Sequence, residues 1–186
     1  MTYPLTTTLA ALREAGACFE GYNRVVRMLQ GRDFTDEDTV RESYMRSTRK
    51  ESISLVDICN NNCLENALWA LRCVKGNDRN SRLYAVWCAR QVEHLSDDPR
   101  VKACNDVAER FANGMATEED LGAARYAVWS TAGSAARSAA GCATGCAARS
   151  AAWSAAWHAR SAAGQQTRQK EMFIEMCEGN APWQLK

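Results

Sequence analysis

Six consecutive four-residue words, SAAR, SAAG, CATG, CAAR, SAAW and SAAW, fill residues 134–157. Alanine is the strongest helix former, and a step of four residues turns a helix by about 400°, so the small-residue surface winds around the helix axis. Such a surface lets neighbouring backbones approach at the short end of about 8–10 Å. We therefore predict an alanine-rich helical region over residues 117–176, packed by its neighbours or by a second copy of the chain.

Helical spacing also marks the rest of the chain. Residues 5–31 predict two short helices broken at Gly16 or Gly21. Further helices are expected from Ser54, over residues 63–76, from Asp78 as N-cap, from Asp98 as N-cap to Gly114, and from a capping box at residues 117–120. Strand signals are weak. The predicted fold class is all-α, a compact multi-helix array with a long alanine-rich C-terminal helical region.

The length of the chain limits its domain organisation. A chain of 186 residues is long enough for one well-buried domain and short for two, so we predict a single helical domain over residues 1–186. Residues 32–52 carry both charge signs and few aliphatic side chains. We therefore predict a charged insertion there and expect it to be mobile.

Nine cysteines, an odd number without CxxC pairs, are interpreted as reduced, buried, hydrophobic side chains. Cys142 and Cys146 simply replace Ser in the repeated words, so cysteine is interpreted as a size equivalent of serine and no metal site is expected. Neither a signal peptide nor a membrane span is indicated. The expected location is the cytoplasm.

The alanine-rich region has charge of one sign. From Leu121 to Lys170 there is no Asp or Glu, while six basic residues occur. Four large side chains follow at steps of four, four and three and so lie within about 80° of arc on a helix: Arg149, Trp153, Trp157 and Arg160. Arg125 and Trp129 repeat the four-residue spacing. Two interpretations stay open, rim packing or a dimer seam on one hand and a cation–π surface for an anionic or planar partner on the other.

Polar side chains also interrupt the apolar helices before this region. The candidate binding residues there are Trp69, Arg72, Arg82, Trp87, Arg90 and His94. An unpaired buried charge is costly. Either Glu65, Asp57 or Glu93 therefore pairs with these arginines, or the arginines line a pocket for a carboxylate or phosphate.

Catalytic signatures are absent from the sequence. There is no phosphate loop, nucleophile elbow, HExxH or paired-glycine fingerprint, and neither histidine sits in a recognisable catalytic pattern. Six positive charges over 50 residues are too sparse for a phosphate-tracking face, so nucleic-acid binding is not favoured. We expect no enzymatic activity and no cofactor.

Three runs in series, CLENALWALRCV, RLYAVWCARQVEHL and DPRVKACNDVAERFANGMATEEDLGAAR, precede the Ala-, Trp- and Ser-rich segment. This series resembles an alanine-rich bacterial and phage family of immunity proteins over about residues 52–175. The resemblance implies an all-helical protein that neutralises a toxin or defence factor by binding it. The cationic region of this nearly neutral chain departs from the acidic character of many nuclease-blocking immunity proteins, which favours an anionic target.

The main functional hypothesis is a non-catalytic helical binding protein of the immunity or anti-defence type, which sequesters a toxin or host-defence protein. One alternative is a phage-type sponge for a small nucleotide immune signal, a cyclic nucleotide or ADP-ribose derivative, held in an Arg- and Trp-lined pocket. Another alternative is a structural helical oligomer. Expected partners are therefore a protein target or an anionic nucleotide, with a homo-oligomer expected and no membrane partner.

Overall fold

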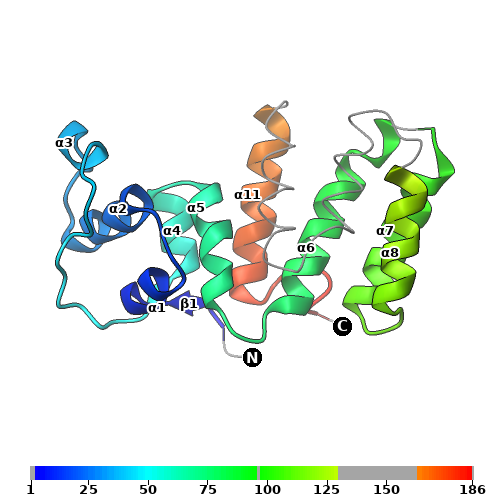
Figure 1. Cartoon of the computed structure of the whole chain (residues 1–186), viewed down its shortest axis with the longest axis horizontal. Helices are drawn as coiled ribbons and strands as arrows, with labels where there is room; N and C mark the ends of the chain where they lie inside the picture. Colours follow the sequence, from blue (N-terminus) through cyan, green and yellow to red (C-terminus); the bar gives the residue numbers. More distant parts are fainter. Residues whose placement is uncertain (1–2, 96, 130–162, 186) are drawn as a thin grey trace. The chain divides into compact units, whose positions relative to one another are not determined.

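The computed structural model describes residues 3–95, 97–129 and 163–185. Over these residues the protein is mostly helical, which confirms the predicted all-α class (Figure 1). The chain divides into two compact units, Thr2–Lys75 (the first unit) and Gly76–Lys186 (the second unit). The single-domain organisation stays a prediction. The repeated words of residues 134–157 lie outside the described residues.

The first unit consists of short helices and a two-stranded sheet. Its elements are β1 (Thr6–Thr7), α1 (Leu9–Glu14), α2 (Phe19–Gln30), α3 (Asp36–Thr39), β2 (Ile53–Ser54), α4 (Leu55–Asn61), α5 (Leu64–Ala70) and the 3-10 helix η1 (Leu71–Cys73). β1 and β2 pair antiparallel, with Thr6 opposite Ser54. The Leu55 N–H also donates to the Leu5 carbonyl at 3.0 Å. The sequence did not predict this pairing, because two-residue strands leave no alternating pattern.

The ends of α2 agree with the sequence signals. Cys18 is the N-cap, and its Sγ accepts the Gly21 N–H at 3.3 Å. Gly31 closes the helix with φ of 64°, a left-handed conformation that favours glycine. The chain breaks before α2 at Gly16, so the first of the two predicted break positions is confirmed and Gly21 lies inside the helix.

The helices after β2 begin at hydrogen-bonding caps. Ser54 caps α4 as predicted, since its Oγ accepts the Val56 N–H at 3.1 Å. The Cys63 Sγ caps α5 by accepting the Asn66 N–H at 3.4 Å. The predicted continuous helix over residues 63–76 is wrong in its second half. The α-helix ends at Ala70 and tightens into η1, a 3-10 turn of the kind that often closes a helix.

Apolar side chains of β2, of Leu5 just before β1, and of α1, α2, α4 and α5 form the buried core of the first unit. The most deeply buried of them include Leu5, Leu9, Leu12, Val25, Val26, Ile53, Leu55, Ile58 and Leu68. Burial of each such side chain stabilises the fold by roughly 1.5–3 kcal/mol relative to exposure. α2 therefore contributes an apolar side to the core, and polar side chains of the same helix contact the charged segment that follows.

That charged segment, residues 32–52, is attached to α2 by an ion pair at α3. Asp38 is 1% exposed, and its two carboxylate oxygens accept hydrogen bonds of 2.7 Å from Nε and Nη2 of Arg27. Asp38 and Thr35 also form a capping box at the start of α3. Bidentate, charge-assisted pairs are among the stronger polar contacts. The segment is thus fixed at α3, and its expected mobility stays a prediction.

The hydrogen bonds from Arg27 hold the pKa of the Asp38 carboxyl well below its usual range. When the pH falls below about 4, the Asp38 carboxylate takes up a proton in the unfolded chain but stays ionised in the folded chain. This contribution to stability is therefore lost toward acid pH. We expect the Asp38→Asn variant to be less stable than the wild type at pH 7, with the difference shrinking below pH 4. Urea unfolding at a series of pH values measures this.

The control for the pH series is Asp33→Asn, which removes the same charge at an exposed neighbouring position. It should change stability little across the range. A difference between wild type and Asp38→Asn that stays constant from neutral to acid pH would contradict the role of the ion pair.

The second unit is a set of packed helices. Its elements are α6 (Asp78–Gln91), the 3-10 helix η2 (Glu93–Leu95), α7 (Pro99–Ala112), α8 (Glu118–Trp129) and α11 (Ala163–Glu178). α7 packs against both α6 and α8, and α6 also contacts α11 (Figure 1). Val86, Ala108 and Leu121 form a buried cluster between α6, α7 and α8, against which Val107 and Phe111 pack.

Two of the predicted helix starts in the second unit are confirmed. Asp98 caps α7 by accepting the Arg100 N–H at 3.0 Å, and Pro99 is the first helical residue. Thr117 and Asp120 form the predicted capping box, because the Asp120 N–H donates to the Thr117 hydroxyl and the Thr117 N–H to the Asp120 carboxylate.

The prediction that Asp78 caps α6 is wrong. The N-cap is Asn77, and its side chain makes no capping hydrogen bond. Instead, the Asn77 amide donates to the Ser81 hydroxyl and accepts from the Asn80 amide, each at 3.1 Å. Asp78 lies in the first turn, where a negative charge favours the helix dipole.

No disulfide joins the seven cysteines that the structure describes. Cys59, Cys88, Cys104 and Cys177 are buried, as expected for small hydrophobic side chains; Cys63 and Cys73 are half-buried, and Cys18 is exposed. Cys18 and Cys63 stand at N-cap positions, which Ser usually occupies. The idea that cysteine acts as a serine equivalent can be tested at Cys18.

We expect Cys18→Ser to keep the stability of the protein, because a hydroxyl accepts the same N–H of Gly21. Cys18→Ala removes the acceptor and should lower the free energy of unfolding by about 1 kcal/mol. Urea unfolding of the two variants measures the difference. Equal stability of Cys18→Ala and the wild type would show that the thiol does not act as a cap.

Candidate functional site

The candidate site is a pocket of about 700 Å³ in the first unit, called the Arg13 pocket below. It is lined by Arg13, Tyr22, Gln30, Tyr44, Met45, Arg46, Ser47, Thr48 and Arg49. α1 and α2 supply the first three residues, and the chain between α3 and β2 supplies the other six. Three separate stretches of sequence therefore build one pocket.

Tyr44 lies at the centre of an aromatic group beside this pocket. Its ring meets Phe19 edge-to-face at 4.7 Å and Tyr22 edge-to-face at 4.9 Å between ring centroids. The Arg13 guanidinium carbon lies over the Tyr44 ring, 4.9 Å from its centroid. Edge-to-face pairs and cation–π contacts are both favourable geometries. The ring and the guanidinium together form a planar, cationic wall.

The lining of the Arg13 pocket is positively charged. It contains three arginines and no Asp or Glu. Arg13 and Arg46 are exposed and form no ion pair with any residue that the structure describes. Arg49 lies 3.4 Å from the Glu51 carboxylate, but both side chains are exposed, and such surface pairs contribute little. These guanidinium groups can therefore donate to an anionic ligand.

The wall that carries Tyr44 is held by hydrogen bonds to α1–α2. The Asn23 side chain, fully buried in α2, donates to the Ser43 carbonyl at 2.9 Å and accepts the Met45 N–H at 2.8 Å. The Tyr44 hydroxyl donates to the Ala17 carbonyl at 2.7 Å. Residues 43–45 are thus fixed although they belong to no helix or strand.

Two smaller pockets on α2, of about 260 and 370 Å³, share Arg24 and Asn62 in their linings. Two of their three arginines have internal partners. Arg24 donates to the Glu20 carboxylate at 2.9 Å and lies 4.1 Å over the Phe34 ring. Arg27 is held by Asp38, and Arg32 is exposed in the lining that also contains Asp33. Because both of these linings include an acidic residue and that of the Arg13 pocket does not, the Arg13 pocket is the stronger candidate for an anion.

The predicted pair Trp69 and Arg72 lies in α5 and η1 and lines none of the three pockets described above. The Arg72 guanidinium carbon lies 4.4 Å over the Trp69 ring, and its Nε is buried without a hydrogen-bond partner. Neither Glu65 nor Asp57 forms an ion pair with it in the described part of the chain. The indole ring, rather than a carboxylate, is the neighbour of this cation.

Arg82 in α6 has a similar environment. Its guanidinium carbon lies 4.6 Å over the Phe111 ring, and its Nε is buried without a hydrogen-bond partner. Trp87 is half-buried and stacks on Tyr84 with a centroid distance of 6.5 Å. His94 is exposed in η2. Arg82 and Trp87 thus contact aromatic rings of the second unit, and the predicted role of all three residues in binding stays a prediction.

Arg90 is surrounded by carboxylates, as one of the two sequence interpretations requires. Its Nη2 donates to Asp106 at 2.8 Å and to Glu109 at 2.6 Å, and its Nη1 lies 3.5 Å from Glu93. The Asn105 amide donates to the same Glu93 carboxylate at 2.8 Å. A guanidinium shared among three carboxylates has little remaining capacity to attract an anion.

The remaining predicted residues belong to the alanine-rich region. Arg125 is an exposed residue of α8, and Trp129 is the last residue of that helix, with a side chain outside the described part. Arg149, Trp153, Trp157 and Arg160 also lie outside it. The predicted cation–π surface stays a prediction.

Sequence reasoning missed the residues of the Arg13 pocket. The stretch YMRSTRK, residues 44–50, already combines an aromatic ring with three cationic side chains, those of Arg46, Arg49 and Lys50. Its composition is typical of a solvated insertion, because aliphatic residues are few. Its link to α2 depends on Asn23, more than twenty residues earlier, which no local pattern reveals.

Neither a metal-binding cluster nor a membrane-spanning helix occurs among the described residues. Within residues 3–95, 97–129 and 163–185, no group of three or more His, Cys, Asp or Glu side chains is placed to hold a metal ion. Among the helices of this part of the chain, none is both long and apolar enough to cross a membrane.

We expect Arg90→Gln to lower the free energy of unfolding by about 1 kcal/mol, since the partly exposed carboxylates around it lose their counter-charge. Added salt should reduce this loss by screening the repulsion. Urea unfolding at low and high salt measures both effects. The control is Lys102→Gln, which removes an exposed charge from α7, the helix that carries Asp106 and Glu109. If both variants lose the same stability, Arg90 has no special structural role.

Comparison of the chain with protein-family models, curated proteins and solved structures finds no match. The likeness to immunity proteins stays a prediction from the sequence motifs. Among the described residues, the geometry and charge of the Arg13 pocket are the features that point to a ligand.

Proposed function

We propose that the protein is a non-catalytic binding protein that sequesters a small anionic ligand with a planar ring, of the nucleotide type, in the Arg13 pocket. The observation that carries this proposal is the lining itself, in which three arginines and two tyrosines occur without a carboxylate. This proposal takes up the nucleotide-sponge hypothesis drawn from the sequence, but it places the ligand on a different set of residues.

The size and chemistry of the pocket support a ligand of this class. Its volume of about 700 Å³ falls within the roughly 300–1,000 Å³ typical of small-molecule sites. Arginine binds phosphate through paired N–H donors and stacks on planar rings. The arrangement of Arg13 on Tyr44 therefore suits a base, while Arg46 and Arg49 suit the phosphates.

The lining also supports capture rather than chemical conversion. Proton transfer in enzymes most often uses His, and otherwise Asp, Glu, Lys, Tyr or Cys side chains. Of these types only Tyr22 and Tyr44 line the Arg13 pocket, and the Tyr44 hydroxyl already donates to the Ala17 carbonyl at 2.7 Å. We therefore infer that the ligand is held and withdrawn from solution unchanged.

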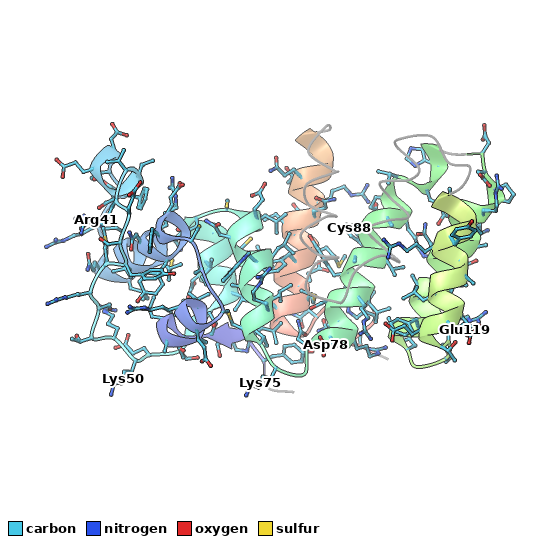
Figure 2. The ribbon with its side chains drawn as sticks, in the orientation of Figure 1. Arg41, Lys50, Lys75, Asp78, Cys88 and Glu119 are labelled. Atoms are coloured by element: carbon cyan, nitrogen blue, oxygen red, sulfur yellow. The ribbon has the colours of Figure 1, made fainter. Side chains whose placement is uncertain are left out.

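Sequestration of a toxin or host-defence protein, which the family resemblance implied, is the second candidate. The observation that favours it is the charge beside the pocket. Arg41 and Lys50, at the two ends of the segment that forms the wall, are both exposed (Figure 2). An acidic surface of a protein target would meet positive charge both in the pocket and around it.

The test is calorimetry of the full-length protein with ADP-ribose, a cyclic dinucleotide and inorganic pyrophosphate. We expect at least one nucleotide to bind with a Kd below about 100 μM, or roughly −5.5 kcal/mol. Arg46→Gln combined with Arg49→Gln should abolish this binding, whereas Arg41→Gln, which removes an exposed charge outside the lining, should not. Absence of binding, or conversion of the nucleotide to a product, would contradict the proposal.

We further expect Arg13→Lys to separate ring recognition from anion recognition. Lysine keeps the positive charge but lacks the planar guanidinium that lies over Tyr44. Affinity for ADP-ribose should fall about tenfold, the equivalent of 1.4 kcal/mol, while affinity for pyrophosphate should change less than twofold. Equal losses for both ligands would mean that Arg13 contributes only its charge.

A further inference from the structure

The wall of the Arg13 pocket is a stretch of chain without regular structure. Between α3 and β2, residues 40–52 belong to no helix or strand. Such a segment has no backbone ladder of its own to fix it. Contacts with α2 and with the turn before it therefore fix its position, and Asn23 supplies two of them, to residues 43 and 45.

Asn23 uses both halves of its amide for this purpose. Nδ2 donates to the Ser43 carbonyl, and Oδ1 accepts the Met45 N–H. The side chain is 0% exposed, so water cannot replace either bond. Asparagine is a modest helix former in the middle of a helix, and its presence in α2 is best explained by these two tertiary contacts.

The two bonds bracket one residue of the pocket. Tyr44 lies between Ser43 and Met45, and its own hydroxyl donates to the Ala17 carbonyl at 2.7 Å. Its ring in turn supports the Arg13 guanidinium. A shift of the backbone at residues 43–45 would therefore displace the ring on which the planar wall is built.

We propose that Asn23 is a positioning residue of the Arg13 pocket, which sets ligand affinity by holding Tyr44 in place. This inference rests on the proposed function for its ligand, but the position of the wall can be measured without one. Asn23 does not line the pocket, so it acts only through the residues that it holds.

The first experiment uses trypsin on the full chain and compares two cleavage sites. Arg46 follows the held residues, and Lys75 lies at the end of the same unit, outside the pocket (Figure 2). The variant is Asn23→Asp, which keeps the acceptor for Met45 but loses the donor to Ser43. We expect cleavage after Arg46 to become about tenfold faster, with cleavage after Lys75 unchanged.

The control variant is Asp38→Asn, which weakens the attachment of the same segment at α3 but leaves both hydrogen bonds of Asn23. It should accelerate cleavage after Arg46 less than Asn23→Asp does. If Asn23→Asp fails to fold, Asn23→Ser is measured in its place. The shorter serine side chain cannot make both hydrogen bonds of the Asn23 amide, and it adds no charge. An unchanged rate after Arg46, or an equal rise at both sites, would overturn the proposal.

The second experiment is a double-mutant cycle in ADP-ribose binding. Asn23→Ser should weaken binding about tenfold in the wild-type background and less than twofold in a Tyr44→Ala background, because Asn23 acts through Tyr44. Equal losses of affinity in the two backgrounds would show that Asn23 does not act through Tyr44 and would overturn the proposal. If the wild type binds none of the three probes, the proposed function fails, while the cleavage comparison still decides whether Asn23 holds the wall.

Discussion

A buried amide must find hydrogen-bond partners within the protein, and in the first unit this requirement falls on Asn23. Its partners belong to the irregular segment after α3, so one polar side chain of α2 fixes a stretch of chain that cannot fix itself. The Arg27–Asp38 ion pair attaches the same segment earlier in the chain. α2 is therefore both a core helix and the support of the candidate site.

Much of the helical architecture follows from local sequence. Short-range hydrogen bonds form the helix caps at Ser54, Asp98 and Thr117 and the helix end at Gly31. Because their partners lie at most four positions apart, a short stretch of sequence is enough to predict them. The predictions failed at the start of α6, where Asn77 bonds to Ser81, and after Ala70, where α5 tightens into a 3-10 turn. The β1–β2 pairing could not be predicted, because it joins residues nearly fifty positions apart without a strand pattern.

The residues of the candidate site could not be predicted from the sequence, and the reason is physical. Arginines inside apolar helices attracted attention because they need partners, and Arg90 indeed has carboxylates around it. Arg72 and Arg82 instead lie over aromatic rings of their own units. The arginines of the Arg13 pocket belong instead to an exposed, irregular segment and to α1, and only the folded chain brings them together.

The short pairing of β1 with β2 has a consequence for how the protein can be handled. It closes the chain from residue 7 to residue 53 into a loop that contains α1, α2 and the whole lining of the Arg13 pocket. A label or surface attachment placed on β1 or β2 would therefore load the pairing that closes this loop.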